Sequence, residues 1–197
     1  ELVILLEPEP SDILGQLYMQ LEISNERTGQ FFTPPELSFF MAKLQVGEEL
    51  NEKIARQGFV TVSEPACGAG GMVLAFAKTV IEQKHNPAHV MWVSCQDIDR
   101  TAAMMCYLQM SLWHIPGVVI VGNTLACEAR EVFYTPAHYL GFWDSKLRRR
   151  EEEEANQEDQ KAEPTVDSEL VPVSTPSKSE PARSPTPGGS VQFDFGF

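Results

Sequence analysis

An α/β fold with parallel strands is predicted by the alternation of apolar strands and helices along the chain. Three short β-branched or apolar runs, at residues 59–62, 90–94 and 118–121, are separated by helical stretches. Strands that are joined through helices form parallel sheets with right-handed crossovers. The sequence therefore predicts three neighbouring parallel strands, and the strands of a second half-sheet are not recognisable.

Residues 63–72, Ser-Glu-Pro-Ala-Cys-Gly-Ala-Gly-Gly-Met, join the first strand to an apolar helix at 72–82. Closely spaced glycines let backbone N–H groups approach a ligand, and the helix directs its positive end at a carboxylate or phosphate. This pattern predicts a nucleotide-cofactor loop. A dinucleotide fingerprint requires glycine or alanine where Val73 stands, which disfavours NAD. The alternative is a tight turn without a ligand, although small residues there would weaken both neighbouring elements.

The region before the first strand carries two predicted helices. Ser11 is a predicted N-cap for the first helix, which has apolar residues at helical spacing. Thr33 and Glu36 predict a capping box for the second helix, with Pro34 at its first position. The predicted buried face of this second helix holds four apolar residues, Leu37, Phe40, Met41 and Leu44.

Acidic residues follow the second strand. A carboxylate at the end of that strand can accept hydrogen bonds from the ribose hydroxyls of a nucleotide cofactor, and Asp97 is the predicted acceptor. Asp97 and Asp99 both also suit the N-cap of the helix expected at 100–113, and that role is assigned to Asp99. The third strand leads into the sequence Gly-Asn-Thr-Leu at 122–125.

Two of these segments together resemble a known family. The sequence Glu-Pro-Ala-Cys-Gly-x-Gly-Gly at 64–71 is similar to the first motif of DNA adenine methyltransferases of the modification (M) subunit type, found in type I restriction-modification systems. Gly-Gln-Phe-Phe-Thr-Pro at 29–34 resembles the motif that precedes the first strand in that family. The resemblance runs from residue 11 to residue 125. It implies a class I S-adenosylmethionine-dependent methyltransferase fold, which is Rossmann-like.

The resemblance implies S-adenosylmethionine as the cofactor and implies roles for particular residues. An aromatic residue and a threonine within 30–34 would contact the methionine end, and Asp97 would bind the ribose. Asn123 stands where the family commonly has an aspartate near the adenine amine, and an amide oxygen can still accept from that amine. The implied cofactor-binding residues are Gln30, Phe31, Phe32, Thr33, Pro34, Glu64, Ala66, Gly68, Gly70, Gly71, Asp97 and Asn123.

The family's base-holding motif, Asn/Asp-Pro-Pro-Phe/Tyr, does not occur in this sequence. In the family this motif holds the target amine and stacks an aromatic ring on a flipped base. The aromatic-rich segment at 128–147 is expected to pack on the domain, with Tyr134 as a minor candidate for base stacking. Two functions are therefore expected: a DNA adenine methyltransferase, or a catalytically inactive cofactor-binding relative that acts through protein contacts as a subunit or decoy. A nicotinamide-dependent oxidoreductase is disfavoured by Val73 and by the motif at 30–34.

Acidic residues outnumber basic residues in both parts of the chain. Residues 1–150 carry 12 Lys and Arg against 17 Asp and Glu, and residues 151–197 carry 3 against 11. Proteins that bind DNA alone usually present a basic face. DNA binding by this chain is therefore expected to need a partner subunit or a local basic patch.

The cysteines and histidines are scattered along the sequence. The four cysteines, Cys67, Cys95, Cys106 and Cys127, include no C-x-x-C pair. Reduced thiols in a cytoplasmic protein are therefore expected, and no metal site is predicted. No apolar run reaches the ~20 residues of a membrane span, and no signal segment is recognisable. Because the chain begins at Glu1 without methionine, a fragment or a processed product is expected.

Three regions are predicted: a methyltransferase-like domain at 1–147, a disordered, acidic Pro/Ser/Glu-rich tail at 148–190, and a terminal segment at 191–197. The terminal segment alternates apolar with polar or small residues, as an extended strand would. It is interpreted either as a docking peptide that adds to a sheet edge, in a homo- or hetero-oligomer, or as a frayed terminus. The strand at 59–62 is the expected open edge.

Overall fold

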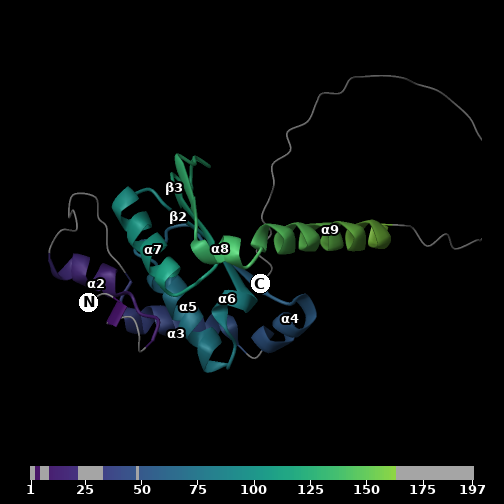
Figure 1. Cartoon of the computed structure of the whole chain (residues 1–197), viewed down its shortest axis with the longest axis horizontal. Helices are drawn as coiled ribbons and strands as arrows, with labels where there is room; N and C mark the ends of the chain where they lie inside the picture. The colour runs from purple at the N-terminus through teal and green to yellow at the C-terminus, as the bar shows by residue number, and fades with distance from the viewer. Residues whose placement is uncertain (1–2, 5–8, 22–32, 48, 163–197) are drawn as a thin grey trace, which may run out of the picture.

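The computed structural model describes residues 3–4, 9–21, 33–47 and 49–162, with side chains described as far as residue 156. Helices alternate with strands through the central part of the chain (Figure 1). The elements are α2 (Ile13–Gln20), α3 (Pro35–Val46), α4 (Glu49–Gln57), β1 (Val60–Glu64), α5 (Gly71–Glu82), α6 (Pro87–Val90), β2 (Met91–Asp97), α7 (Arg100–Leu112), β3 (Gly117–Val121), β4 (Glu131–Tyr134), α8 (Pro136–Leu140) and α9 (Trp143–Ala162).

The described sheet has four strands in the order β1-β2-β3-β4. The first three strands are parallel, and the register places Glu64 opposite Cys95 and Asp97 opposite Val121. The predicted α/β, Rossmann-like fold with three parallel strands is thereby confirmed. The fourth strand, β4, was not predicted as a strand, and it pairs antiparallel with β3. Within this sheet β1 is an edge strand, as expected.

The core lies between the sheet and the helices that connect its strands. In β2, alternate residues face this core and are fully buried: Met91, Val93 and Cys95. Helix α5 packs on β1 and against α3, while α7 packs on β2 and β3. Apolar residues surround α5 on most of its circumference, because the sheet and α3 cover different sides of it.

Helix α3 buries a different face from the one predicted. The four apolar residues of the predicted stripe, Leu37, Phe40, Met41 and Leu44, are 40–68% exposed. Instead, Ser38, Ala42 and Val46 face α5 and are buried. Small residues let two helices approach closely, so the contact with α5 selects this smaller face of α3. The predicted stripe lies on the opposite, open side.

The predicted starts of the first two helices are also wrong in detail. Asp12, not Ser11, caps α2, because its side chain accepts a hydrogen bond from the N–H group of Gly15. Helix α3 begins one residue later than predicted, at Pro35, and Pro34 at its N-cap has no side-chain capping bond. The capping box of Thr33 and Glu36 is therefore absent. Asp99 does cap α7, as predicted, by accepting from the N–H group of Thr101 at 2.7 Å.

Helix α9 continues through the first part of the region that was predicted to be disordered. It runs to Ala162 and projects away from the sheet in Figure 1. Ion pairs four residues apart join Arg149 to Glu153 and Arg150 to Glu154, at 3.0 and 2.7 Å. Such pairs stabilise helices, which explains why composition alone was misleading for 148–162. The rest of the predicted tail and the terminal segment at 191–197 lie outside the described residues.

Within the described ranges, none of the helices combines the length and the apolar character that crossing a membrane requires.

Candidate functional site

The loops that follow β1, β2 and β3 meet at the carboxyl edge of the sheet. The N–H group of Cys67 donates to the carbonyl of Gln96 at 2.9 Å, and that of Gly122 donates to the carbonyl of Asp97 at 2.9 Å. The hydroxyl of Thr124 donates to the carbonyl of Pro65 at 2.6 Å. Backbone and side-chain hydrogen bonds therefore hold all three loops together, which is the usual position of a ligand site in an open α/β sheet.

Asp97, at the end of β2, is hydrogen-bonded to the glycine-rich loop. Its Oδ2 atom accepts from the N–H group of Gly68 at 2.8 Å, and its Oδ1 atom accepts from that of Asp99 at 2.8 Å. Each carboxylate oxygen has capacity for a further hydrogen bond. Asp97 is therefore held in a fixed orientation beside the loop and can still accept from ligand hydroxyls.

The glycine-rich loop has a backbone conformation that depends on its glycines. Gly68 and Gly70 have φ values of 53° and 97°, in the left-handed region that favours glycine. A Cβ atom at Gly70 would lie 3.0 Å from the Sγ atom of Cys106. Gly70 is the N-cap of α5 and has no side chain with which to cap this helix. The first turn of α5 therefore directs uncapped N–H groups towards the loop, as a site for a negatively charged group requires.

Glu64 and Asn123 lie at the ends of the neighbouring strands. The carboxylate of Glu64 accepts from the N–H group of Ala66 at 3.2 Å. Burial raises the pKa of Glu64, and the negative charge of Asp97 raises it further. The side-chain oxygen of Asn123 accepts from the N–H group of Ala126 at 3.3 Å, which closes the turn after β3. The structure thus brings Glu64, Ala66, Gly68, Asp97 and Asn123 to one edge of the sheet.

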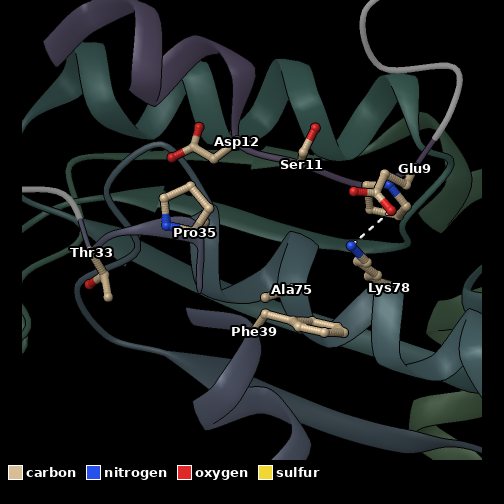
Figure 2. A pocket seen from close by; sticks show the side chains of 10 residues that line it. Glu9, Ser11, Asp12, Thr33, Pro35, Phe39, Ala75 and Lys78 are labelled. Atoms are coloured by element: carbon tan, nitrogen blue, oxygen red, sulfur yellow. Dashed lines mark ion pairs between the residues drawn. The ribbon is translucent and has the colours of Figure 1, made fainter. Parts of the chain in front are cut away.

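A pocket of roughly 70 Å³ lies beside the first half of α5, where Gly71, Ala75 and Lys78 line it. Figure 2 shows Ser11 and Asp12 on one side of it, and Phe39 and Ala75 on the opposite side. An ion pair of 2.8 Å between Lys78 and Glu9 lies at one end. Its lining residues are Glu9, Pro10, Ser11, Asp12, Thr33, Pro35, Phe39, Gly71, Ala75 and Lys78.

The pocket brings together two of the implied cofactor-binding residues that are distant in sequence. Thr33 and Gly71 both line it. Pro34 is exposed and adjoins Thr33, but it does not line the pocket. The other three implied residues of the segment 30–34, Gln30, Phe31 and Phe32, lie outside the described residues. Its position at the start of α5 links this pocket to the glycine-rich loop.

A buried polar network behind the glycine-rich loop was missed at the sequence level. Gln109 is fully buried in α7, and its amide nitrogen donates to the carbonyl of Ala69 at 2.8 Å and to Asp12 at 2.9 Å. Its amide oxygen accepts from the N–H group of Leu14 at 3.1 Å. The network therefore fixes α2 and the glycine-rich loop relative to α7. A glutamine within an apolar helical stretch was the only sequence signal for it.

Two further features of the site also escaped prediction. Burial raises the pKa of Asp12, which is only 7% exposed, although hydrogen bonds from Gln109 and Gly15 oppose this shift. Ser38, close to Gly71, has a buried hydroxyl with no hydrogen-bond partner among the described residues. A buried polar group without a partner is unusual in a folded protein.

Exposed apolar side chains flank Asp97 and Asn123. Ile98, directly after Asp97, is 62% exposed, and Leu125 is 98% exposed. The guanidinium of Arg130 donates to the carbonyl of Ile98 at 2.7 Å. The site therefore offers apolar surface for a flat ring beside hydrogen-bond acceptors. Neither Ile98 nor Leu125 was singled out from the sequence.

Comparison with known proteins gives a family match and a likeness to solved structures. The model of the N-6 DNA methylase family matches residues 9–158. A solved structure from Listeria monocytogenes, described as a class I S-adenosylmethionine-dependent methyltransferase, is 17% identical, with a TM-score of 0.35. That likeness covers 70% of this chain and 50% of the other, so the chain spans half the length of that structure. No curated protein matches the chain. Because the family model matches well over half of its residues, the chain belongs to the N-6 DNA methylase family.

Proposed function

We propose that this chain binds S-adenosylmethionine at the carboxyl edge of its sheet and provides it for methylation of the adenine amine in DNA, as part of a restriction-modification system. Membership in the N-6 DNA methylase family implies S-adenosylmethionine as the cofactor and DNA as the substrate class. The modification-subunit type and the adenine target rest on the resemblance of 29–34 and 64–71. A cytoplasmic location belongs to the same proposal. So does a partner subunit, because acidic residues outnumber basic residues in the sequence, whereas proteins that bind DNA alone usually present a basic face.

The observation that carries this proposal is the hydrogen bond between Asp97 and the glycine-rich loop. It joins an acid at the end of β2 to Gly68, which has a left-handed backbone, next to the uncapped start of α5. A nucleoside needs a fixed acceptor for its ribose hydroxyls and close access to a backbone without side chains. Both requirements are met within one hydrogen-bonded unit.

The remaining residues suit the two ends of S-adenosylmethionine. We assign the adenine ring to the exposed apolar side chains of Ile98 and Leu125, with Asn123 as the acceptor for its amine. We assign the methionine end to the pocket at the start of α5, where Asp12 and Lys78 supply opposite charges for its ammonium and carboxylate groups. S-adenosylmethionine, when bound, supplies the methyl group for transfer.

Calorimetry with S-adenosylmethionine and with NAD tests the cofactor. We expect binding of S-adenosylmethionine alone, weakened roughly 10- to 100-fold in Asp97→Ala, because hydrogen bonds to a charged acceptor contribute about 1.5–3 kcal/mol. Asp99→Ala is the matched control, since Asp99 caps α7 two residues further on. That control is expected to lower stability by about 1 kcal/mol without changing affinity. Equal affinities in the Asp97 variant and the parent chain would remove Asp97 from the site.

A second candidate function is a cofactor-binding subunit or decoy that transfers no methyl group. The observation that favours it is the absence of the Asn/Asp-Pro-Pro-aromatic sequence, which would hold and stack the target base. Without those acceptors and that ring, we expect no detectable methyl transfer by the chain alone. Incubation with methyl-labelled S-adenosylmethionine and DNA of mixed sequence decides between the two functions. Incorporation into adenine that is lost in Gly68→Asp would favour the enzyme and would direct attention to Tyr134.

A further inference from the structure

Three of the four cysteines, distant in sequence, meet behind the glycine-rich loop. Cys67 lies in that loop, Cys95 in β2 and Cys106 in α7. Their three Sγ atoms all lie within 4.8 Å of one another. Cys95 and Cys106 are fully buried, and Cys67 is 6% exposed. The sequence contains no spacing that predicts this cluster, and the scattered cysteines had indicated no metal site.

A fourth sulfur atom completes the cluster. The Sδ atom of Met110 lies 3.6 Å from the Sγ atom of Cys106 and 3.7 Å from that of Cys95. Because Cys106 and Met110 are four residues apart in α7, they lie on the same face of that helix. The loop, the second strand and the helix therefore bring three thiols and one thioether together in the core.

The distances match the size of a metal–sulfur centre. An ion bound to three sulfur atoms at about 2.3 Å holds those atoms about 4 Å apart, which lies within the observed limit. Soft sulfur donors select Cu(I) and zinc among biological metals, whereas carboxylate and carbonyl oxygens suit Mg²⁺ and Ca²⁺. A thioether is a ligand of copper rather than of structural zinc, which takes cysteine and histidine. The donor set therefore favours Cu(I).

We propose that Cys67, Cys95 and Cys106, with Met110 as a fourth sulfur donor, form a buried binding site for one Cu(I) ion. Binding of the ion replaces thiol protons, because the thiolate is the ligand form of cysteine. Cys67, at 6% exposed, is the least buried of the three cysteines, so we assign the route of entry to the glycine-rich loop. The site is distinct from that of the proposed cofactor, because three of its four donor residues, Cys95, Cys106 and Met110, are fully buried.

Titration of the reduced chain with Cu(I) under anaerobic conditions, against a chromogenic Cu(I) chelator, tests the site. Cys127 is the matched control because it is exposed and lies outside the cluster. We expect one chelator-resistant Cu(I) ion per chain, retained in Cys127→Ser. We expect at least a 100-fold loss of affinity in Cys106→Ala, and a smaller loss, of about tenfold, in Met110→Leu, which keeps the side-chain volume. X-ray absorption at the copper edge is expected to show sulfur neighbours only.

Two further measurements separate metal binding from packing. Cu(I) is expected to raise the Tm of the parent chain and of Cys127→Ser, but not that of Cys106→Ala, because an ion that binds only the folded state stabilises it. Circular dichroism checks that each variant is folded. If Cys106→Ala does not fold, Cys95→Ser takes its place in both experiments. The proposal is overturned if the parent chain loses all Cu(I) to the chelator, if Cys106→Ala and Cys95→Ser retain it, or if retention depends on Cys127. In each of these cases the three thiols act only as small apolar side chains in the core.

Discussion

Helices α5 and α9 are stabilised in opposite ways. Seven of the 12 residues of α5 are buried, from Val73 to Val80, and the helix has no side-chain cap. In α9, by contrast, Trp143 is the only buried residue among those whose side chains are described. Ion pairs between residues four apart occupy the middle of this helix, at 148–154, such as that of Arg149 and Glu153. Tertiary contacts thus hold α5, whereas local charges hold most of α9.

This contrast separates the two terms that determine whether a segment is helical. Packing of an apolar face supplies most of the stability of helices in folded proteins, and ion pairs on a surface contribute only tenths of a kcal/mol each. A change in α5 should therefore be felt by the whole domain. A change in the outer part of α9 should be felt only locally. Four substitutions test which residues contribute to the stability of the whole domain and which act only locally.

Trp143→Ala should have the largest effect. It tests whether the first residue of α9, unlike the rest of that helix, is held by tertiary packing. The indole ring is fully buried, edge-on to Phe59 with the ring centroids 5.0 Å apart. Its removal is expected to lower the free energy of unfolding by about 3–5 kcal/mol. The neighbouring Phe142, which is 77% exposed, provides the control Phe142→Ala. A denaturant titration that gives similar losses for both would show that α9 is not anchored by Trp143.

Leu74→Ala should have the next largest effect and would sharpen the contrast within α5. Leu74 is 1% exposed, in the second turn of the helix. The substitution leaves a cavity and removes apolar atoms whose burial is favourable. Together these effects are expected to lower the free energy of unfolding by about 2–4 kcal/mol. Ile81→Ala, in the same helix but 40% exposed, should lower it by less than half as much. Equal losses in urea unfolding would contradict the assignment of α5 stability to burial.

Asp12→Asn tests a buried charge beside the start of α5. Burial raises the pKa of Asp12 above its ordinary value of 3.8, so the folded chain holds this proton more tightly than the unfolded chain. The contribution of Asp12 to stability is therefore lost as the pH rises from 3.8 through the folded-state pKa, and the loss persists at neutral pH. The free energy of unfolding of the variant minus that of the parent chain should therefore be larger at pH 7 than at pH 4. A stability difference that is constant across urea titrations in this pH range would refute the buried-charge effect.

Arg149→Ala should have the smallest effect. The ion pair with Glu153 is 3.0 Å long and exposed to solvent. Its loss is expected to leave global unfolding within about 0.5 kcal/mol and to speed amide exchange in α9 only. At high salt the parent chain and the variant should exchange alike, because the charges are screened. A global loss of more than about 1 kcal/mol would mean that the outer part of α9 belongs to the folded core.

The parallel part of the sheet and the glycine-rich loop were predictable because their signals are local. Each of the predicted strands, at 59–62, 90–94 and 118–121, begins within two residues of the start of an observed strand. Gly70 signals its own left-handed backbone, and Asp99 signals the helix that it caps. In each case the residue and its structural consequence lie within one turn or one strand.

The features that escaped prediction depend on contacts between distant segments. For α3, periodicity identified an apolar face, but the face that packs against α5 is a different one, which contains Ser38 and Ala42. Strand β4 was missed because four residues that alternate in burial give a weak signal without the neighbouring β3. The cluster of Cys67, Cys95 and Cys106 exists only because the loop, β2 and α7 converge.

Gln109 shows that this fold can distinguish between side chains of equal shape. Its amide presents two donor hydrogens to two acceptors, the carbonyl of Ala69 and the carboxylate of Asp12, and one oxygen to the N–H group of Leu14. A glutamate at this position would have the same volume, but it would oppose oxygen to oxygen at both Ala69 and Asp12. The identity of this residue is therefore specified by the polarity of its neighbours rather than by the space it fills.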